Sequence, residues 1–153
     1  MAVDQGDLRI LTDRGPLVLE LGAAEAGRWL KALQKPVPTL GQKLGVTAGC
    51  LAFVMGPLED AVLAAALLGV CTDDLAAAGV LMAVMRGPGD LAVAFELAGS
   101  APHLAIWCVY PKGRASPVTD AMVRGYFRDR GYMDSKACAV SDVWTATRYG
   151  RRG

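Results

Sequence analysis

The chain has 153 residues, of which 53% are hydrophobic and 20% are charged. This length corresponds to one ordinary domain, and the apolar content excludes an intrinsically disordered chain. No apolar run approaches the roughly 20 residues that span a bilayer, and residues 1–10 lack the basic and apolar segments of a secretory signal. We therefore expect a soluble, cytoplasmic protein with no membrane partner.

The net charge of +1 is unevenly distributed along the chain. Residues 1–111 carry 7 basic and 11 acidic side chains, whereas residues 112–153 carry 9 basic and 4 acidic ones. An acidic body with a basic C-terminal third favours self-association or the binding of a small anion. The last arginines of the chain are too few for a nucleic-acid footprint, so we expect no nucleic-acid partner.

The four cysteines have no metal-binding spacing: they stand at Cys50, Cys71, Cys108 and Cys138. No two of them form a CxxC pair, and His103 is the only histidine, so a structural zinc site is not expected. Three of the four lie in apolar runs. We predict buried, reduced thiols.

The first 37 residues are expected to form an extension that is separate from the rest. Residues 8–21 contain two apolar runs around a turn sequence, which predicts a β-hairpin. Residues 23–34 have apolar side chains at helical spacing, and the two prolines that follow end this helix. We place the boundary there and predict a core of residues 38–153.

The core alternates buried strands with helices. Strands are predicted over residues 50–55, 79–85 and 103–110, where continuous apolar runs indicate a parallel sheet covered on both faces. Helices are predicted over residues 58–70, 91–98 and 120–130. Asp90 is the expected cap of the second helix, and Thr119 or Ser116 that of the third.

Two further strands, over residues 132–141 and 143–149, are predicted to pair antiparallel around a turn near Asp142. Strands that alternate with helices require parallel crossovers. The expected fold is therefore α/β: a Rossmann-like three-layer sandwich with a mostly parallel sheet and a C-terminal antiparallel hairpin. The N-terminal β-hairpin and helix precede it.

Ligands of open α/β sheets bind beyond the carboxyl ends of the strands. The loop after the first core strand contains Gly56 but lacks the GxGxxG pattern of a dinucleotide site and the related pattern GxGxG, so no nucleotide cofactor is expected. The second loop, with Arg86, reads either as a phosphate cradle or as an ordinary turn before a helix. We expect no cofactor.

The third loop presents Lys112 and Arg114 close to the start of the next helix. Cations beside helix amides make an anion site, although two solvated charges would give the same pattern. In the C-terminal hairpin, Asp142 is followed by Trp144 and Thr145, and the three form the best polar cluster of the chain. The alternative is a turn aspartate beside a packing tryptophan. No serine or cysteine lies in a nucleophile elbow, so no catalytic residue is predicted.

The segments IWCVYPK, over residues 106–112, and DVWTATR, over residues 142–148, resemble those of a bacterial family of unknown function. The sequences KLGV and LLG, over residues 43–46 and 67–69, are also similar to this family. Its members look like a shortened methyltransferase-like Rossmann domain. The resemblance implies that Pro111, Lys112, Asp142 and Trp144 are signature positions, and it implies no particular reaction.

Three functions follow from these observations. The favoured hypothesis is a non-catalytic α/β module that binds a small anionic ligand or a protein partner and self-associates as a homodimer. The alternative is a degenerate S-adenosylmethionine-dependent methyltransferase, whose cofactor contacts would come from the backbone around Gly56. A third function, an enzyme of another class that uses Lys112 and Asp142 as a polar pair, requires those two side chains to converge.

Overall fold

The computed structural model describes residues 2–153, and the chain divides into two compact units, Met1–Val37 and Pro38–Gly153. In the first unit, β1 (Ala2–Asp4), β2 (Asp7–Thr12) and β3 (Gly15–Glu20) form an antiparallel sheet in that order. The helix α1 (Ala23–Gln34) follows, with the predicted bounds. The predicted hairpin corresponds to β2 and β3; β1 was not predicted, because three residues are too few to show a periodicity.

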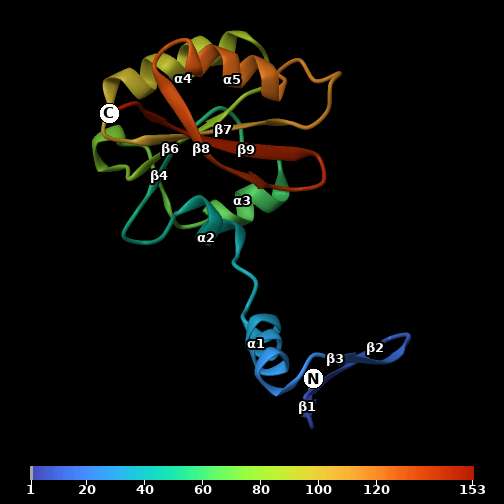
Figure 1. Ribbon diagram of the computed structural model, residues 1–153. Helices are drawn as coiled ribbons and strands as arrows, with labels where there is room; N and C mark the ends of the chain where they lie inside the picture. The colour runs from blue at the N-terminus through green and yellow to red at the C-terminus, as the bar shows by residue number, and fades with distance from the viewer. Residues whose placement is uncertain (1) are drawn as a thin grey trace. The chain divides into compact units, whose positions relative to one another are not determined.

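The second unit contains a six-stranded sheet and four α-helices, drawn in Figure 1. Its strands are β4 (Ala52–Met55), β5 (Cys71–Thr72), β6 (Val80–Val84), β7 (Ala105–Pro111), β8 (Tyr132–Ala139) and β9 (Trp144–Arg151). Its helices are α2 (Leu40–Leu44), α3 (Ala61–Leu67), α4 (Gly89–Ser100) and α5 (Asp120–Arg128), with a 3-10 turn, η1, at Leu75–Ala77.

The strand order in this sheet is β5-β4-β6-β7-β9-β8. β4 pairs in parallel with β5 and β6, and β6 pairs in parallel with β7, whereas β9 is antiparallel to both of its neighbours. The chain leaves β4 through α3 toward the edge strand β5 and then returns past β4 to β6. Successive strands are therefore added first on one side of β4 and then on the other, so the strand order reverses between β4 and β6. We call this place the reversal point. The predicted mixed α/β class, parallel core and antiparallel C-terminal hairpin are confirmed.

Helices cover both faces of the sheet: α4 and α5 lie on one face, and α2 and α3 on the other (Figure 1). β6 explains why both faces need a cover, since all five of its residues are buried. Leu81 and Ala83 belong to the cluster under α4 and α5, while Met82 and Val84 belong to the cluster over α2 and α3. A strand buried on both faces is typical of a parallel sheet.

Two predictions about helix starts need correction, and a third is confirmed in one of its two alternatives. The helix predicted over residues 58–70 is only Ala61–Leu67, because the Asp60 carboxylate accepts a hydrogen bond from the amide of Leu63 and so begins the helix there. Asp90 does not cap α4; it lies inside the first turn of that helix, which begins at Gly89. Of the two candidates for capping α5, Thr119 is the cap, since it accepts from the amide of Met122.

The short helix α2 was not predicted. Its cap is a reciprocal pair: Thr39 accepts from the amide of Gln42, and the Gln42 side chain accepts from the amide of Thr39. This T-x-x-Q sequence is a capping box and is visible in the sequence.

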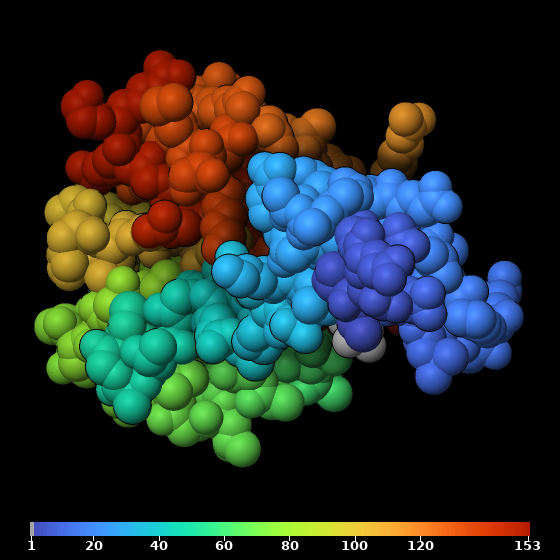
Figure 2. Space-filling view, turned by 60° about the horizontal axis from the view of Figure 1, so that its bottom comes forward, coloured from blue at the N-terminus to red at the C-terminus, as the bar shows by residue number. Residues whose placement is uncertain are grey.

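In the view of Figure 2, both the teal residues around α2 and the red residues of the C-terminal strands reach the surface.

The cysteines are less buried than predicted. Only Cys108 is buried, Cys71 is exposed, and Cys50 and Cys138 are intermediate; all four are free thiols. Cys71 is exposed because it lies on β5, the edge strand, which has only two residues and leaves one side of the strand uncovered. Among the helices of residues 2–153, none has the length and apolar character required to cross a bilayer.

Candidate functional site

A pocket of about 650 Å³ opens at the carboxyl end of β7, hereafter the Tyr110 pocket. Its size falls in the range of small-molecule sites, about 300–1,000 Å³. Three parts of the second unit build it: the end of β7 with the loop that follows, the start of α5, and one face of β8 and β9. The polar residues that line it are Tyr110, Lys112, Arg114, Thr119, Asp120, Thr145 and Thr147.

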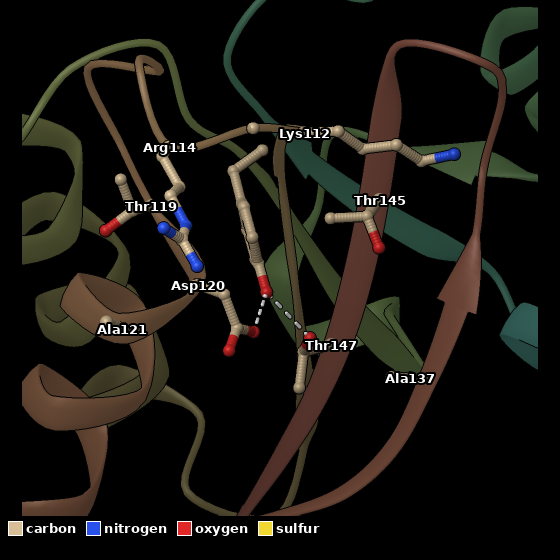
Figure 3. Close-up of a pocket in the computed structure, with 10 residues that line it drawn as sticks. Lys112, Arg114, Thr119, Asp120, Ala121, Ala137, Thr145 and Thr147 are labelled. Atoms are coloured by element: carbon tan, nitrogen blue, oxygen red, sulfur yellow. Dashed lines mark hydrogen bonds between the residues drawn. The ribbon is translucent and has the colours of Figure 1, made fainter.

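The floor of the pocket is a hydrogen-bonded triad of side chains (Figure 3). The Tyr110 hydroxyl donates to the Asp120 Oδ1 at 2.6 Å and shares a hydrogen bond of 2.9 Å with the Thr147 Oγ1. Tyr110 and Thr147 are only 1% and 2% exposed. Burial, and next the bond to the Asp120 carboxylate, raise the pKa of Tyr110 well above its ordinary value, so this phenol stays protonated at neutral pH.

Asp120 is ionised and its charge is compensated. The hydrogen bond from Tyr110 is the largest effect that lowers its pKa, and the hydrogen bond and charge of Arg124 add to it. Arg124 Nη2 lies 3.3 Å from Asp120 Oδ2, while Arg124 Nη1 lies 2.9 Å from Asp134 Oδ2. Arg128 Nη2 approaches the same Asp134 at 2.6 Å. These ion pairs hold α5 against β8.

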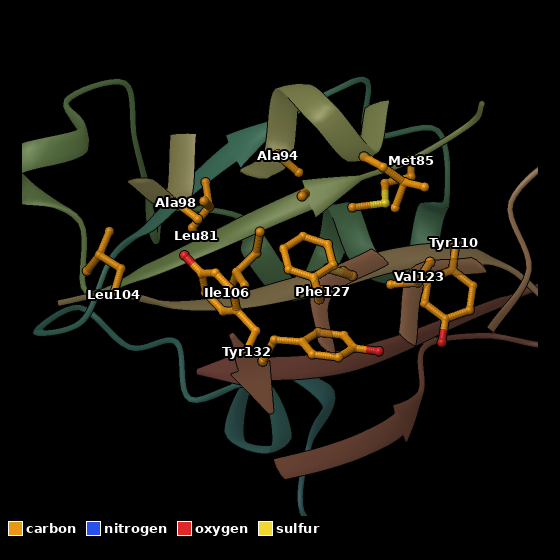
Figure 4. Packing of buried hydrophobic residues seen from close by; sticks show 14 of the residues in the cluster. Leu81, Met85, Ala94, Ala98, Leu104, Ile106, Tyr110, Val123, Phe127 and Tyr132 are labelled. Atoms are coloured by element: carbon orange, nitrogen blue, oxygen red, sulfur yellow. The ribbon is translucent and has the colours of Figure 1, made fainter. Parts of the chain in front are cut away.

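The hydrophobic core fixes the same helix from beneath. Val123 and Phe127 of α5 are buried in the cluster that contains Tyr110 (Figure 4). Phe127 stacks on Tyr149 of β9, with ring centroids 5.1 Å apart, and meets Tyr132 edge to face at 5.4 Å. Aromatic pairs of these geometries add stability beyond their buried area. These contacts hold α5 against the sheet beside the pocket.

Two cations flank the mouth of the pocket. Lys112 extends over β9, and its Nζ donates to the Ser141 carbonyl at 2.6 Å, which leaves two of the three ammonium protons unused. Arg114 extends the other way, toward the start of α5 (Figure 3). Within residues 38–153, neither side chain forms an ion pair with a carboxylate. Lys112 and Arg114, both predicted from the sequence, therefore line the same pocket, and their charged groups lie on opposite sides of it.

Gly56 and Arg86 lie elsewhere, at the carboxyl ends of β4 and β6, where the strand order reverses. Gly56 has φ of +88°, and a Cβ built on it would lie 2.4 Å from the Val84 carbonyl oxygen, so only glycine fits this contact. The Arg86 guanidinium forms an ion pair with Glu59. These contacts join the two loops across the reversal point.

The loop between β6 and α4 also uses its own amides. The Asp90 carboxylate accepts from the amide of Arg86 at 2.8 Å and from that of Gly87 at 3.1 Å. These are the amides that a bound phosphate would need at this position. Of the two interpretations of this loop, the contacts favour the ordinary turn.

Asp142 and Trp144 are not part of the Tyr110 pocket. Asp142 is exposed at the tip of the β8–β9 turn. Trp144 packs on the opposite face of the sheet, in the cluster over α2 and α3. Residues alternate between faces along a strand, so Thr145 faces the pocket and Trp144 does not. No ion pair joins Lys112 to Asp142 within residues 2–153. The Lys112 ammonium group donates to the carbonyl of Ser141, the residue before Asp142.

The signature positions of the resemblance meet in one place all the same. Pro111 and Trp144 are direct partners in the pairing of β7 with β9. The Lys112 amide donates to the Val143 carbonyl at 2.7 Å, and its ammonium group to the Ser141 carbonyl. These contacts fasten the end of β7 to the β8–β9 turn, a structural role that also fixes the position of Lys112.

Sequence reasoning did not identify Tyr110, Asp120 or Thr147 as site residues, and it named Thr145 only as part of the polar cluster with Asp142. Two signals for them were present: Tyr110 ends a predicted strand and Asp120 begins a predicted helix. In β9 the two threonines are separated by one residue, so they share a face. No group of three or more His, Cys, Asp or Glu side chains suited to a metal ion occurs within residues 2–153.

Comparisons with protein-family models, curated proteins and solved structures found no match to this chain.

Proposed function

We propose that residues 38–153 form a non-catalytic binding module for a small organic anion, with the Tyr110 pocket as its site. The observation that carries the proposal is the charge balance there. Asp120, the one carboxylate of the pocket, is compensated by Tyr110 and Arg124, whereas Lys112 and Arg114 have no carboxylate partner within residues 38–153. The uncompensated charge of the pocket is positive.

The ligand class follows from the other side chains. Gly113, Ala121 and Ala137 line the pocket with apolar surface, so the ligand has an apolar body as well as an anionic group. A carboxylate matches the planar guanidinium of Arg114 and the point charge of Lys112. The Thr145 hydroxyl donates to the Cys138 carbonyl at 3.3 Å and keeps its lone pairs for a donor on the ligand.

The strand order of the second unit carries a proposal about its fold. We propose that the second unit is a shortened Rossmann-like domain. The order β5-β4-β6-β7 corresponds to strands 2-1-4-5 of the Rossmann order 3-2-1-4-5-6, with strand 3 absent. The sheet departs from the Rossmann order at β9, which lies beside β7 and is antiparallel to it. This order also supports the resemblance to the bacterial family of methyltransferase-like Rossmann domains.

Titration with benzoate and with benzyl alcohol tests the proposal, because the two molecules share an aromatic body and differ in charge. We expect benzoate to shift the backbone amide resonances of Gly113, Ala121 and Thr145. Benzyl alcohol should bind at least tenfold more weakly. Equal affinities, or benzoate-induced shifts confined to other parts of the chain, would refute an anion site in this pocket.

A methyltransferase-like enzyme is the second candidate, and the reversal of strand order between β4 and β6 favours it. Against it stand the single glycine of the first loop and the ion pair of Arg86 with Glu59 across the reversal point. Isothermal titration with S-adenosylmethionine separates the two candidates. Absence of heat at high micromolar ligand would exclude the second one.

A further inference from the structure

A second pocket, of about 290 Å³, opens at the other end of the sheet. It lies at the amino ends of β6 and β7, next to Val80 and Ala105, whereas the Tyr110 pocket lies at the carboxyl end of β7. α2 forms one wall, and β8 and β9 contribute Lys136 and Arg148. We call it the Lys136 pocket.

Three basic side chains line this pocket, and none of its lining residues is acidic. They are Lys43 at the end of α2, Lys136 on β8 and Arg148 on β9. Lys136 and Arg148 are direct partners in the strand pairing. Like charges opposite each other destabilise a sheet unless something compensates them. The Lys136 Nζ donates to the Lys43 carbonyl at 2.9 Å, which draws its charge toward α2.

Ion pairs occupy some cations of the same unit but not these three. Arg86, Arg124 and Arg128 all form ion pairs with carboxylates. Within residues 38–153, no such ion pair involves Lys43, Lys136 or Arg148. The positive charge of the Lys136 pocket is therefore not compensated by the chain itself.

Contacts within the chain hold the walls of the Lys136 pocket together. Trp107 is 1% exposed, and its indole Nε1 donates to the Leu44 carbonyl at 2.9 Å, which ties the end of α2 to β7. Gly79 touches Cys50: a Cβ at position 79 would lie 2.4 Å from the Cys50 Sγ. A preformed cavity avoids the ordering cost that usually weakens binding.

We propose that the Lys136 pocket binds a phosphate group, either as inorganic phosphate or as a small phosphate monoester. A dianion matches three cations better than a single carboxylate does, and the fork of Arg148 can donate two parallel hydrogen bonds to phosphate oxygens. The volume of about 290 Å³ admits a phosphate group with a small substituent. This site is independent of the anion site proposed at the Tyr110 pocket.

Titration of the full chain with inorganic phosphate and with glycerol 3-phosphate tests the proposal, at constant ionic strength. We expect saturable shifts of the amide resonances of Gly45, Gly79 and Lys136, with no comparable shift at Gly113 or Thr145. Tighter binding of the monoester would identify an esterified ligand, and equal or weaker binding would identify free phosphate. No saturable shift at 10 mM of either probe, or shifts at the Tyr110 pocket alone, would overturn it.

The double variant Lys136→Gln/Arg148→Gln should weaken phosphate binding at least tenfold and should not reduce the unfolding free energy, since it removes a pair of like charges. The control variant Lys31→Gln/Lys35→Gln loses the same charge at exposed positions of the first unit and should bind as the wild type does. The conservative variant Lys136→Arg/Arg148→Lys keeps the charge and should retain binding within about threefold. Equal weakening in the control variant would show a general charge effect and refute the site.

Discussion

The Tyr110 hydroxyl lies 2.6 Å from the Asp120 Oδ1 and joins the end of β7 to the first residue of α5. This bond closes the floor of the pocket and keeps Asp120 ionised against the buried surface beside it. It also explains how an aspartate can line a pocket whose uncompensated charge is positive. The Tyr110–Asp120 hydrogen bond therefore connects β7 to α5 and also stabilises the charged form of Asp120.

Tyr110→Phe should test the strength of this bond. We expect a loss of about 1.5–3 kcal/mol in unfolding free energy, as for hydrogen bonds to charged groups, and a rise in the pKa of Asp120. Urea unfolding measures the first and NMR titration the second. Tyr126→Phe is the control, since no hydrogen bond of the Tyr126 hydroxyl occurs within residues 2–153. If both variants unfold alike, the bond contributes no more than an ordinary surface hydroxyl.

The unfolding free energy of the protein should be constant near neutral pH and should decrease toward acid pH. The pKa values of Asp120 and Asp134 are lowered in the folded chain, by hydrogen bonds from Tyr110 and Arg128 in the first place. Their stabilisation is complete above the unfolded pKa, about 3.9, and is lost as the pH falls through the folded values. Urea unfolding between pH 2.5 and 7 should show this decrease.

For Tyr110 the dependence of stability on pH runs the other way, because burial raises the pKa of this residue. Its neutral form is favoured in the folded chain, so its contribution is complete below the unfolded value of about 10 and declines as the pH rises through and above that value.

The variant Arg124→Gln should flatten the acid side of this pH profile of stability and leave the alkaline side unchanged. An acid side that is equally steep in this variant would show that other carboxylates dominate.

Gly56→Ala should destabilise the second unit by about 2 kcal/mol or more. A side chain there meets both a left-handed backbone and the Val84 carbonyl. Gly125→Ala is the matched control, because position 125 is helical and open, so that variant should gain about 0.5–1 kcal/mol. Thermal unfolding of the two variants measures the difference. A neutral Gly56→Ala would mean that the two loops separate easily.

Residues 38–153 should fold without the first unit, since both core clusters of the sheet lie within this range. Near-ultraviolet circular dichroism of the fragment would show native aromatic packing. The same fragment tests the predicted homodimer. If residues 1–37 contact a second subunit, the solution mass should fall from dimer to monomer on deletion, and an unchanged oligomer would count against that role.

Particular residues explain what sequence reasoning could and could not predict. The strands around Val54, Met82 and Cys108 were predictable because continuous apolar runs between glycines and prolines have few other interpretations. The cation pair Lys112 and Arg114 followed from the rule that loops at strand ends bind ligands. Both inferences depend on local sequence alone.

The rest depends on contacts between distant parts of the chain. Tyr110 and Thr147 are 37 residues apart and meet only because β9 inserts beside β7. The pairing of Arg86 with Glu59, 27 residues away, is likewise invisible in the sequence. Trp144 was placed in the site although strand alternation turns it to the other face; applying that alternation from Thr145 would have corrected it.

The central claim is that Lys112 and Arg114 make the Tyr110 pocket an anion site. Isothermal titration with benzoate should therefore give a dissociation constant at least tenfold weaker for Lys112→Gln/Arg114→Gln than for the wild type, at unchanged unfolding free energy. The charge-matched variant Lys31→Gln/Lys35→Gln should bind benzoate as the wild type does. Undiminished binding by Lys112→Gln/Arg114→Gln would contradict the account.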